Sequence, residues 1–432
     1  MLRRANIHSR RRFTLAQLNL PTAMLHRYPA LIFLLLSPAL SNAAGFQLNL
    51  QGLRQLAMGN CGVAAPWDNA VIFYNPGALA RIDSGMIYGS LLGVFPSTRL
   101  VQRGTGAVTD AERQVFTPFN LYASTPVRRT KGLSLGICMY MPFGTGLRWG
   151  NGWTGRYVTQ EIGLQTLFVQ PTASYRLSQM FSVGAGLVYA AGNFHLNSAI
   201  PVQNATGEDG QARLEGNASG VGFNAGIHAQ LAPKFSAGLS YRSGVKMQVK
   251  SGDANFSVAA GAAANFPNTS FKATLPLPKV ISLGIAASLT PKLDLTAEAN
   301  FTGWATYDTL RFDYGTETSA LQDTRAPRRY RNAMAGRNGL RYAATKALHL
   351  MIGGAYDASP VRDGYVSPDL PDASRIVATG GLSYRATKRL DVLAAVEFVN
   401  SKKRDGWYDA EQFGGMYQIK AFTAGVGVSY RF

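Results

Sequence analysis

The chain has 432 residues and a formal net charge of +19. It contains 46 glycines, 19 tyrosines and 22 phenylalanines, and 16% of its residues are charged. Many glycines and aromatic residues with few charges favour closed β-architecture with aromatic girdles. The basic balance would suit nucleic acid, but the arginines are spread along the chain and the sequence has no basic helix or aromatic-studded recognition motif, which excludes a nucleic-acid partner.

The N-terminal region has the pattern of an export signal. Arg27 precedes an apolar run at residues 30–36, and the Ser-Asn-Ala sequence that follows suits cleavage by signal peptidase. We therefore expect residues 1–43 to be a signal peptide and the mature chain to begin at Ala44. Met24 is an alternative start, because a signal beginning there has an ordinary length.

Residues 44–83 show no sustained hydrophobic alternation and are rich in small and turn-forming residues. A segment of this length is too short to be a stable domain by itself, so we expect it to pack against something larger. The sequence therefore predicts a plug, or hatch, inside the structure that the rest of the chain forms.

Residues 84–432 contain recurrent alternating segments, separated by clusters of glycine, proline, aspartate and asparagine. Outside the N-terminal region no apolar run reaches the roughly 18 residues of a membrane-spanning helix, and a membrane protein without such helices must close its sheet as a barrel. The predicted fold class is all-β, a transmembrane antiparallel β-barrel of about 14 strands with the plug in its lumen. The expected strands are 84–98, 117–128, 132–142, 164–177, 180–198, 214–231, 234–250, 270–289, 292–314, 328–345, 347–357, 374–386, 388–402 and 415–432.

The last strand shows the alternation most clearly. Phe422, Val426 and Tyr430 share one face, which suits lipid, while Thr423 and Ser429 share the other, which suits water. A strand of a soluble sandwich would alternate in the same way, but a strand that stops on an aromatic residue is typical of barrels in the bacterial outer membrane. The expected location is therefore the bacterial outer membrane.

Several charged residues fall on the expected inward face of the strands. A basic side chain on the lipid face would cost about 2–4 kcal/mol near the midplane, so their position supports the assignment of faces. We expect them to hold the plug to the wall, and direct contact with a ligand is the alternative. These residues are Arg176, Arg242, Asp294, Glu298, Asp391, Glu397 and Arg431.

The links between strands are of two lengths, which is typical of such barrels. Two-residue links at 233–234 and 291–292 are predicted to be periplasmic turns. Longer segments are predicted to be extracellular loops, namely 143–163, 199–213, 251–269 and 358–373.

Without residues 1–43 the chain keeps 37 basic and 24 acidic residues, a net charge of +13. We expect a monomer embedded in outer-membrane lipid, with the phosphate-rich lipopolysaccharide of the outer leaflet as the favoured partner of this charge. Anionic ligands are the second choice, and a solvated surface of mixed sign is the plain alternative.

The sequence has no catalytic cluster. Residues 132–136 match G-x-S-x-G, but a nucleophile elbow needs a sharp turn from strand to helix, whereas these residues lie within an alternating strand. Three widely spaced histidines in the mature chain form neither a metal cluster nor a Ser-His pair, so we expect no enzyme, no metal and no cofactor. Cys61 and Cys138 are the two cysteines, and they could form one disulfide in the periplasm.

The expected plug contains two motifs about thirty residues apart. Ala44-Gly45-Phe46-Gln47-Leu48-Asn49 opens the mature chain, and the segment from Val71 to Ala80 contains Asn75-Pro76-Gly77, which by itself is ordinary turn chemistry. After an export signal and before a barrel, this pair resembles the FadL family of outer-membrane transporters for long-chain fatty acids and other hydrophobic compounds. The family usually has Asn-Pro-Ala, so Gly77 departs from its pattern.

Further matches extend over nearly the whole mature chain. Their order and spacing resemble those of the family, and the strongest is a D-x-S-P-V sequence followed by P-D-x-x-R. They are Met141-Pro142-Phe143-Gly144 followed by Trp149 to Tyr157, Leu275-Pro276 through Trp304, and Asp357-Ala358-Ser359-Pro360-Val361 followed by Pro371-Asp372 and Arg375.

The resemblance implies a plug that blocks any aqueous route, a hydrophobic pocket between plug and wall, and a kink in the third strand that opens a lateral exit into the membrane. Carried onto this chain, it gives three groups of site residues. The gating plug has Gly45, Phe46, Asn75, Pro76 and Gly77; the kinked strand has Gly136 and Cys138; and an external surface for ligand capture, or else an aromatic girdle, has Phe143, Leu147, Trp149 and Trp153.

Transport is expected to be passive, because the sequence has no nucleotide-binding loop and no clear box for an energising partner. Long-chain fatty acids are the favoured substrates, and aromatic or alkane hydrocarbons are the alternative. A general porin and a barrel lipid hydrolase are the less favoured readings, since the first needs an open lumen and the second needs a catalytic cluster.

Overall fold

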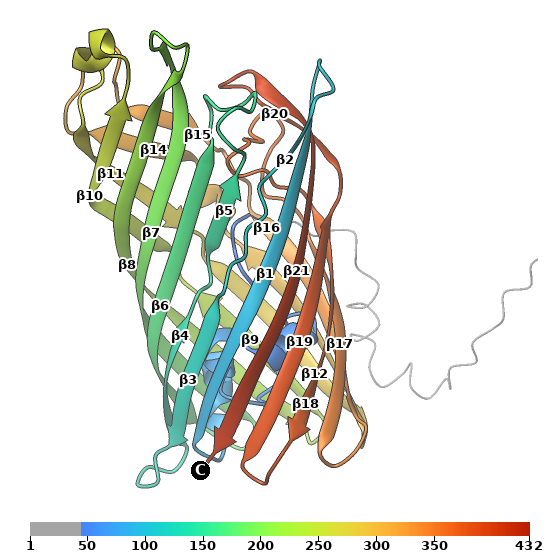
Figure 1. The fold of residues 1–432 in the computed structure, drawn as a ribbon. Coiled ribbons are helices and arrows are strands. Elements are labelled where there is room, and N and C mark those ends of the chain that lie inside the picture. Colours follow the sequence, from blue (N-terminus) through green and yellow to red (C-terminus); the bar gives the residue numbers. More distant parts are fainter. Residues whose placement is uncertain (1–44) are drawn as a thin grey trace, which may run out of the picture. The chain divides into compact units, whose positions relative to one another are not determined.

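The computed structural model describes residues 45–432, so the predicted signal peptide, the alternative start at Met24 and Ala44 lie outside the described residues. The described strands form a closed antiparallel barrel, because the first strand, β1 (Met86–Gln102), pairs along its whole length with the last, β21 (Phe413–Arg431) (Figure 1). Within this range no helix is long and apolar enough to cross a membrane.

The strand segments make fourteen barrel strands, which confirms the predicted number and the predicted order along the chain. Five barrel strands consist of two consecutive segments each, while β2 (Val108–Asp110) and β20 (Arg404–Tyr408) pair with the ends of β1 and β21 among the long loops. Between β1 and β21 the barrel strands are β3 (Phe119–Pro126), β4 (Leu133–Tyr140) with β5 (Gly144–Arg148), β6 (Glu161–Arg176), β7 (Phe181–Gln203), β8 (Asp209–Ala232), β9 (Phe235–Arg242) with β10 (Val245–Ser257), β11 (Thr269–Leu277) with β12 (Val280–Thr290), β13 (Leu293–Thr302) with β14 (Thr309–Tyr314), β15 (Thr324–Pro327) with β16 (Ala333–Ala343), β17 (Leu348–Asp357), β18 (Arg375–Arg385) and β19 (Leu390–Ser401).

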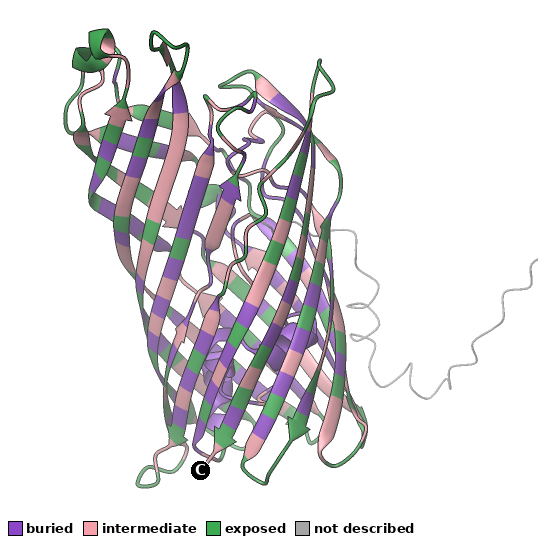
Figure 2. Ribbon diagram, viewed as in Figure 1, coloured by how far each residue is buried: buried purple, intermediate pink, exposed green. Residues whose placement is uncertain are grey.

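Along each strand, exposed and buried residues alternate, so the ribbons are banded (Figure 2). On β21 the outward Val426 is 64% exposed, whereas the inward Thr423 and Ser429 are each 1% exposed. An apolar outer face over a polar, filled interior is the pattern of a barrel in a lipid bilayer. The predicted assignment of inward and outward residues on this strand is therefore confirmed.

Three of the predicted extracellular loops are shorter than expected. β5 and the start of β6 occupy the two ends of the loop predicted at 143–163. β7 continues to Gln203 and β8 begins at Asp209, which leaves five residues where a loop over 199–213 was predicted. β10 likewise continues to Ser257 and takes part of the predicted loop 251–269. Paired strands that project beyond the membrane no longer need a lipid face, so alternation of hydrophobic residues does not mark their ends.

Residues 45–83, called the inner segment below, lie within the ring of strands. The segment contains three short helices, α3 (Leu53–Ala57), α4 (Val71–Tyr74) and the 3₁₀ helix η1 (Pro76–Arg81). α3 contacts β17, β18, β19 and β21, and η1 contacts β6, β7 and β8 across the lumen. Figure 1 shows these helices in blue inside the lower half of the barrel. That this segment closes the lumen remains a prediction.

Charged side chains of the wall hold the inner segment. Arg54 donates to Asp68 at 2.8 Å and to the wall residue Asp391 at 2.5 Å. Asn60 donates to Glu397 at 3.0 Å, and the backbone N–H groups of residues 62 and 63 donate to Glu298 at 3.0 and 3.1 Å. Buried charges need such partners, since an unpaired one costs several kcal/mol. These contacts confirm that lumen charges hold this segment to the wall.

Two further 3₁₀ helices lie outside the inner segment. η2 (Ala260–Asn265) lies between β10 and β11, and its residues are mostly exposed. η3 (Trp304–Thr306) lies between β13 and β14 and carries Trp304, whose side chain is fully buried. The second helix therefore contributes to the interior of the barrel.

Candidate functional site

The third barrel strand is interrupted between β4 and β5. Tyr140 pairs with Phe168 and Gly144 pairs with Gln165, so three residues of the third strand face two residues of β6. An extra residue on one strand is a β-bulge, which bends the strand and disrupts the ladder locally. At the bulge the hydroxyl of Thr166 donates to the Phe143 carbonyl oxygen at 2.6 Å and replaces a missing backbone bond.

The start of the inner segment pairs with this bulge. The Leu48 N–H donates to the Pro142 carbonyl oxygen at 2.8 Å, and the Gly144 N–H donates to the Phe46 carbonyl oxygen at 3.1 Å. The Gln51 side chain donates to the Met141 carbonyl oxygen at 3.1 Å. The inner segment thus satisfies backbone groups that the bulge takes out of the sheet.

Beyond the bulge the strand pairing of the barrel wall has a gap beside β5. Within residues 45–432, the strand pairing gives β5 one strand neighbour, β6, because β3 begins at Phe119, beside the lower half of β1. The side chain of Phe116 fills the gap on the other side of β5, where a Cβ placed on Gly146 would lie 2.2 Å from the end of the Phe116 ring. Glycine at position 146 therefore makes room for this ring.

A cavity of about 340 Å³ lies between this gap and the inner segment. Its walls come from the start of the inner segment, the upper half of β1, the bulge, β6, and the extracellular loop between β17 and β18. This size is within the range of ligand sites, which are mostly apolar with few polar groups. The residues on which the site depends are Gly45, Phe46, Phe116, Phe143, Leu147 and Arg375.

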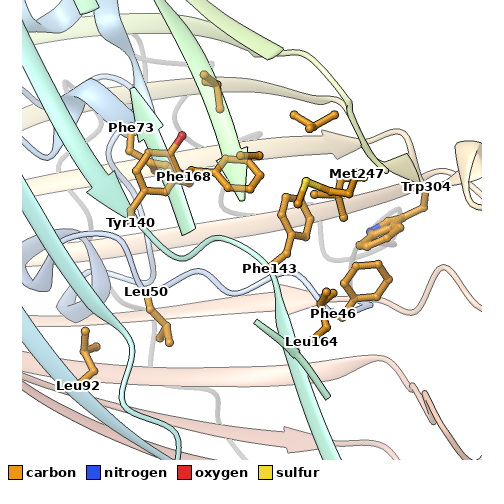
Figure 3. Close-up of a cluster of buried hydrophobic side chains, with 14 of the residues drawn as sticks. Phe46, Leu50, Phe73, Leu92, Tyr140, Phe143, Leu164, Phe168, Met247 and Trp304 are labelled. Atoms are coloured by element: carbon orange, nitrogen blue, oxygen red, sulfur yellow. The ribbon is translucent and has the colours of Figure 1, made fainter. Parts of the chain in front are cut away.

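Aromatic rings form the inner wall of the cavity (Figure 3). Phe46 packs edge-on against Trp304 at 4.9 Å between ring centroids, and its ring lies 6.0 Å from that of Phe143. A smaller apolar recess of about 40 Å³ continues from Phe46 among Leu164, Met247 and other apolar side chains of the upper barrel. Apolar side chains therefore make up most of the lining of the site, which suits a water-insoluble ligand.

The charged groups around the cavity are largely paired with one another. Arg328 forms a buried ion pair with Asp369 at 2.5 Å, and Ser359 donates to Asp372 at 2.6 Å. Arg375 is held less tightly, since its partner Asp357 lies 3.6 Å away and its side chain is 20% exposed. Arg375 is therefore the cationic group that is freest to meet an anionic part of a ligand.

The two carboxyl groups of this loop have shifted pKa values of opposite sign. Burial would raise the pKa of Asp369, but the charge and hydrogen bonds of Arg328 outweigh it and hold the pKa below its usual value. Burial also raises the pKa of Asp372, and there it outweighs the charge of Arg375 and the hydrogen bonds of Ser359 and Gly45. Asp369 therefore stays ionised more readily than Asp372.

The structure separates the predicted gating residues into two places. Gly45 and Phe46 line the cavity, whereas Asn75, Pro76 and Gly77 form a turn at the start of η1. The Asn75 side chain accepts the Gly77 N–H at 3.0 Å and donates to the Val63 carbonyl oxygen at 2.7 Å. This turn caps η1, and its gating role stays a prediction.

The kink of the third strand does not lie at Gly136, where the sequence analysis placed it. β4 pairs in regular register with β3 and β6 through Gly136 and Cys138, and the irregularity lies at residues 141–143. Gly136 has another role, because a Cβ there would lie 2.6 Å from the end of the Ile72 side chain. The missing side chain lets the inner segment approach the wall closely.

The two tryptophans predicted for ligand capture are buried. Trp149 and Trp153 stack with centroids 4.8 Å apart and are 4% and 6% exposed, so neither an external capture surface nor a girdle includes them. Their indole N–H groups donate to the carbonyl oxygens of Pro368 at 2.9 Å and of Thr159 at 2.7 Å. They hold extracellular loops together, while Phe143 and Leu147 do line the cavity.

The disulfide considered from the sequence is absent from the described residues, where Cys61 and Cys138 are both free and buried. Cys138 lies on β4 beside the carbonyl oxygen of Gln170, and Cys61 lies near the carboxylate of Glu298 across the lumen. The two thiols lie beside different parts of the wall, so the hypothesis of a Cys61–Cys138 disulfide is wrong for this structure.

Sequence reasoning missed Phe116 and the role of Arg375 in the cavity. Residues 99–116 were assigned to no element, because their hydrophobic residues follow neither a strand nor a helix period. The motif around Arg375 marked the residue, but its place beside the cavity depends on the fold of the loop between β17 and β18. Pro142 could have marked the bulge in the sequence, because proline within a sheet is confined to edge strands, strand starts and bulges.

Comparison with known proteins gives the family. Residues 34–432 match the family model described as outer membrane protein transport protein (OMPP1/FadL/TodX). The long-chain fatty acid transport protein of Escherichia coli O6:H1 is 25% identical over 379 residues, covering 78% of this chain and 83% of that protein.

Two solved structures resemble the barrel. The crystal structure of a Pseudomonas aeruginosa FadL homologue has a TM-score of 0.79 at 19% identity and covers 90% of this chain and 100% of its own. The P. putida toluene transporter TodX has a TM-score of 0.71 at 15% identity, covering 88% of this chain and 98% of its own. At these identities the two structures support the fold.

Proposed function

The chain belongs to the OMPP1/FadL/TodX family and is an outer-membrane transporter of hydrophobic compounds, and we propose that its substrates are long-chain fatty acids. Members of this family are transporters rather than enzymes. The proposed route starts at the extracellular loops, enters the apolar cavity and leaves sideways past Phe116 into the membrane. Transport is passive, driven by transfer of the acyl chain from water into lipid.

The observation that carries this proposal is the position of the cavity. It reaches the bulge and the gap beside β5, while the inner segment fills the lumen below it with buried, hydrogen-bonded residues. A ligand moving straight down would exchange apolar contacts for polar ones, whereas a sideways exit keeps about 0.8 kcal/mol of favourable burial for each CH₂. A lateral exit is therefore the less costly path.

Arg375 supports fatty acids over neutral hydrocarbons. It borders the cavity, and Asp357 is shared between Arg375 at 3.6 Å and Arg337 at 2.9 Å. A fatty-acid carboxylate at this point would make a charge-assisted hydrogen bond with the guanidinium group. A neutral hydrocarbon has no charge that could pair with the Arg375 guanidinium group.

Aromatic or alkane hydrocarbons are the second candidate. The recess of about 40 Å³ beyond Phe46 is lined almost wholly by apolar side chains, which include Phe194, Met247 and Phe312. A small uncharged molecule in the adjoining cavity could place an apolar group in this recess without any charge partner. A similar fold in a toluene transporter agrees with this candidate.

The deciding experiment measures uptake of labelled oleate and labelled toluene by cells that lack their own fatty-acid transporter, with and without this protein. The fatty-acid proposal is supported if oleate uptake is lower with Arg375→Gln than with the wild type while the variant still folds as a barrel. Uptake of toluene alone, unaffected by Arg375→Gln, favours hydrocarbons. Uptake of neither, with a folded barrel in the membrane, contradicts the proposal.

Contact with lipopolysaccharide and a monomeric state stay predictions. A single stoichiometry in native mass spectrometry, measured at several detergent concentrations, tests the monomer. Co-purification of lipopolysaccharide that survives delipidation tests the contact, and a protein free of it speaks against that partner.

A further inference from the structure

The excess positive charge of the chain gathers at one end of the barrel. The short hairpin turns, the start of β1 and the C-terminus of β21 lie at the same end, because antiparallel strands alternate direction around the ring (Figure 1). In outer-membrane barrels the short turns are periplasmic. This periplasmic rim comprises residues 80–86, 127–132, 175–182, 231–236, 289–294, 341–348, 384–391 and 430–432.

The rim holds thirteen basic residues against three acidic residues, Asp83, Asp294 and Asp391. The rest of the described chain is close to balance, with 24 basic and 21 acidic residues. The charge balance therefore supports a further partner at the periplasmic end, while contact with lipopolysaccharide in the opposite leaflet stays a separate prediction.

The positive charge is repeated around the circumference. Five of the six hairpin turns in the periplasmic rim carry a lysine. The remaining turn, at 177–180, lies beside Arg176 and Arg81. The five residues are called the rim lysines below and are Lys131, Lys234, Lys292, Lys346 and Lys388. A ring of this kind presents the same chemistry in every direction.

The rim lysines are free to bind. All five are exposed, and in the part of the chain that the structure describes their side chains take part in no hydrogen bond or ion pair. By contrast, the acidic residues of the rim are engaged, since Asp83 pairs with Arg176 at 2.7 Å, Asp294 with Arg341 at 2.7 Å and Asp391 with Arg431 at 2.5 Å. The positive potential of the rim is therefore not neutralised from within the protein.

An aromatic belt fixes the depth of the rim lysines in the membrane. Each belt residue lies on the outer face close to a turn, and their exposed fractions are between 41% and 49%. Exposed tyrosine and phenylalanine rings at this height mark the border between hydrocarbon and headgroups. The belt residues are Tyr175, Phe181, Tyr342, Tyr384 and Tyr430. Lys346 and Lys388 follow Tyr342 and Tyr384 by four residues, so their ammonium groups reach the headgroup layer.

We propose that the rim lysines bind the phosphate groups of anionic phospholipids in the inner leaflet of the outer membrane. Lysine side chains keep an apolar stem along the barrel and carry the charge to the level of the phosphates. The occupant is a lipid rather than a soluble protein, because a folded partner would contact one arc of the rim, whereas the lysines encircle it. Lipid headgroups surround the barrel in the same way.

The test measures lipid binding by native mass spectrometry on the full chain, purified, delipidated and offered equal amounts of phosphatidylglycerol and phosphatidylethanolamine. The wild type should retain phosphatidylglycerol over phosphatidylethanolamine by about fivefold or more, and higher salt should reduce this ratio. The variant with all five rim lysines changed to glutamine should show a clearly smaller preference, since eight arginines and three acidic residues remain in the rim.

The matched control also loses five exposed lysines, changed to glutamine at the other end of the barrel, and it should keep the preference of the wild type. These residues are Lys246, Lys250, Lys272, Lys403 and Lys420. All proteins are first shown to migrate as folded barrels in unheated gels. A wild type without preference, a rim variant that keeps it, or a control that loses it equally would overturn the proposal. The result is independent of whether the protein carries fatty acids.

Discussion

At the scale of single residues, glycines decide how closely the inner segment approaches the wall. The turn at Asn75-Pro76-Gly77 rests on wall glycines, and a Cβ at Gly226 would lie 2.0 Å from the Asn75 side-chain oxygen. A Cβ at Gly77 would itself lie 2.5 Å from the Gly226 carbonyl oxygen. This contact gives a physical reason for glycine where the family usually has alanine.

Restoring that alanine is therefore expected to destabilise this barrel. Gly77→Ala forces a backbone shift against the wall, and overpacking of this kind costs about 1–3 kcal/mol. Urea unfolding of the purified protein measures the change. Gly261→Ala is the control, because a Cβ at Gly261 meets no atom within 4 Å. Equal stability of the two variants would show that the close approach at Gly77 is mistaken.

The two carboxyl groups of the extracellular loop predict opposite effects of pH. Because the pKa of Asp369 is lowered in the folded loop, its stabilisation is present above its unfolded pKa and is lost as pH falls through the folded value. Asp369→Asn leaves the buried Arg328 unpaired and should cost about 3–5 kcal/mol near neutral pH. The difference from wild type should shrink in acid.

The pKa of Asp372 is raised, so the sign is reversed: its contribution is present below the unfolded pKa and is lost as pH rises through the folded value. Asp372→Asn should therefore be no less stable than wild type near neutral pH. Tryptophan fluorescence, to which Trp149 contributes through its contact with Pro368 of this loop, reports the urea transition of both variants. A large loss at neutral pH for Asp372→Asn would contradict the assignment.

At the scale of elements, the inner segment depends on its buried ion pairs. Arg54 bridges Asp68 of the segment and Asp391 of β19, and its side chain is 6% exposed. Arg54→Ala leaves buried carboxylates without this partner, which should loosen α3 by about 3–5 kcal/mol. Hydrogen exchange of the amides of residues 53–57 measures it.

An exposed ion pair is the control for that variant. Arg99 and Asp110 are more than half exposed, and exposed pairs contribute about 0–1 kcal/mol. Arg99→Ala should leave exchange in α3 unchanged. Equal exchange in α3 for Arg54→Ala and Arg99→Ala would mean that the lumen ion pairs do not hold the segment.

Phe116 is the side chain that separates the cavity from the membrane in the proposed route. Phe116→Ala should speed oleate uptake roughly severalfold if passage through the gap limits the rate. The control Phe398→Ala removes an exposed ring from the lipid face of β19, which β21 separates from β1 and the gap. Uptake that is unchanged in Phe116→Ala, or raised equally in Phe398→Ala, would argue against an exit at this gap.

The strands could be predicted from the sequence because alternation is a local signal. Each barrel residue faces lipid or lumen, so period 2 appears in every strand and the count of fourteen follows. The bulge could not be placed in the same way. Its position depends on Thr166 and on the start of the inner segment, which are distant in sequence and meet Phe143 only in the folded chain.

The site was predicted less fully than the fold for the same reason. Phe46 and Phe143 belong to motifs that resemble those of the family, Leu147 was predicted to act with Phe143, and all three line the cavity. Trp149 and Trp153 looked like an exposed aromatic cluster, yet their indole groups bond within the loops, which no pattern in the sequence indicates. Gly136 suggested a kink, whereas the structure uses it for contact with Ile72.

At the scale of the whole molecule, the inner segment inside the lumen is predicted to distinguish this protein from a general porin. The inner segment contacts strands on opposite sides of the ring, and most of its side chains are buried. In planar bilayers the wild type should therefore show little steady ion conductance. Large, continuous channels with the conductance of an open pore would mean that the inner segment does not close the lumen.

The lateral route can be tested by photo-crosslinking with an oleate analogue that carries a diazirine at the end of its acyl chain. The path of the ligand is read from the residues that form adducts in membrane-embedded protein. We expect adducts along the cavity and at the gap, on Phe143, Leu147 and Phe116, and unlabelled oleate should suppress them. Adducts on lumen residues below the cavity, such as Asn60 and Glu298, would contradict the lateral route.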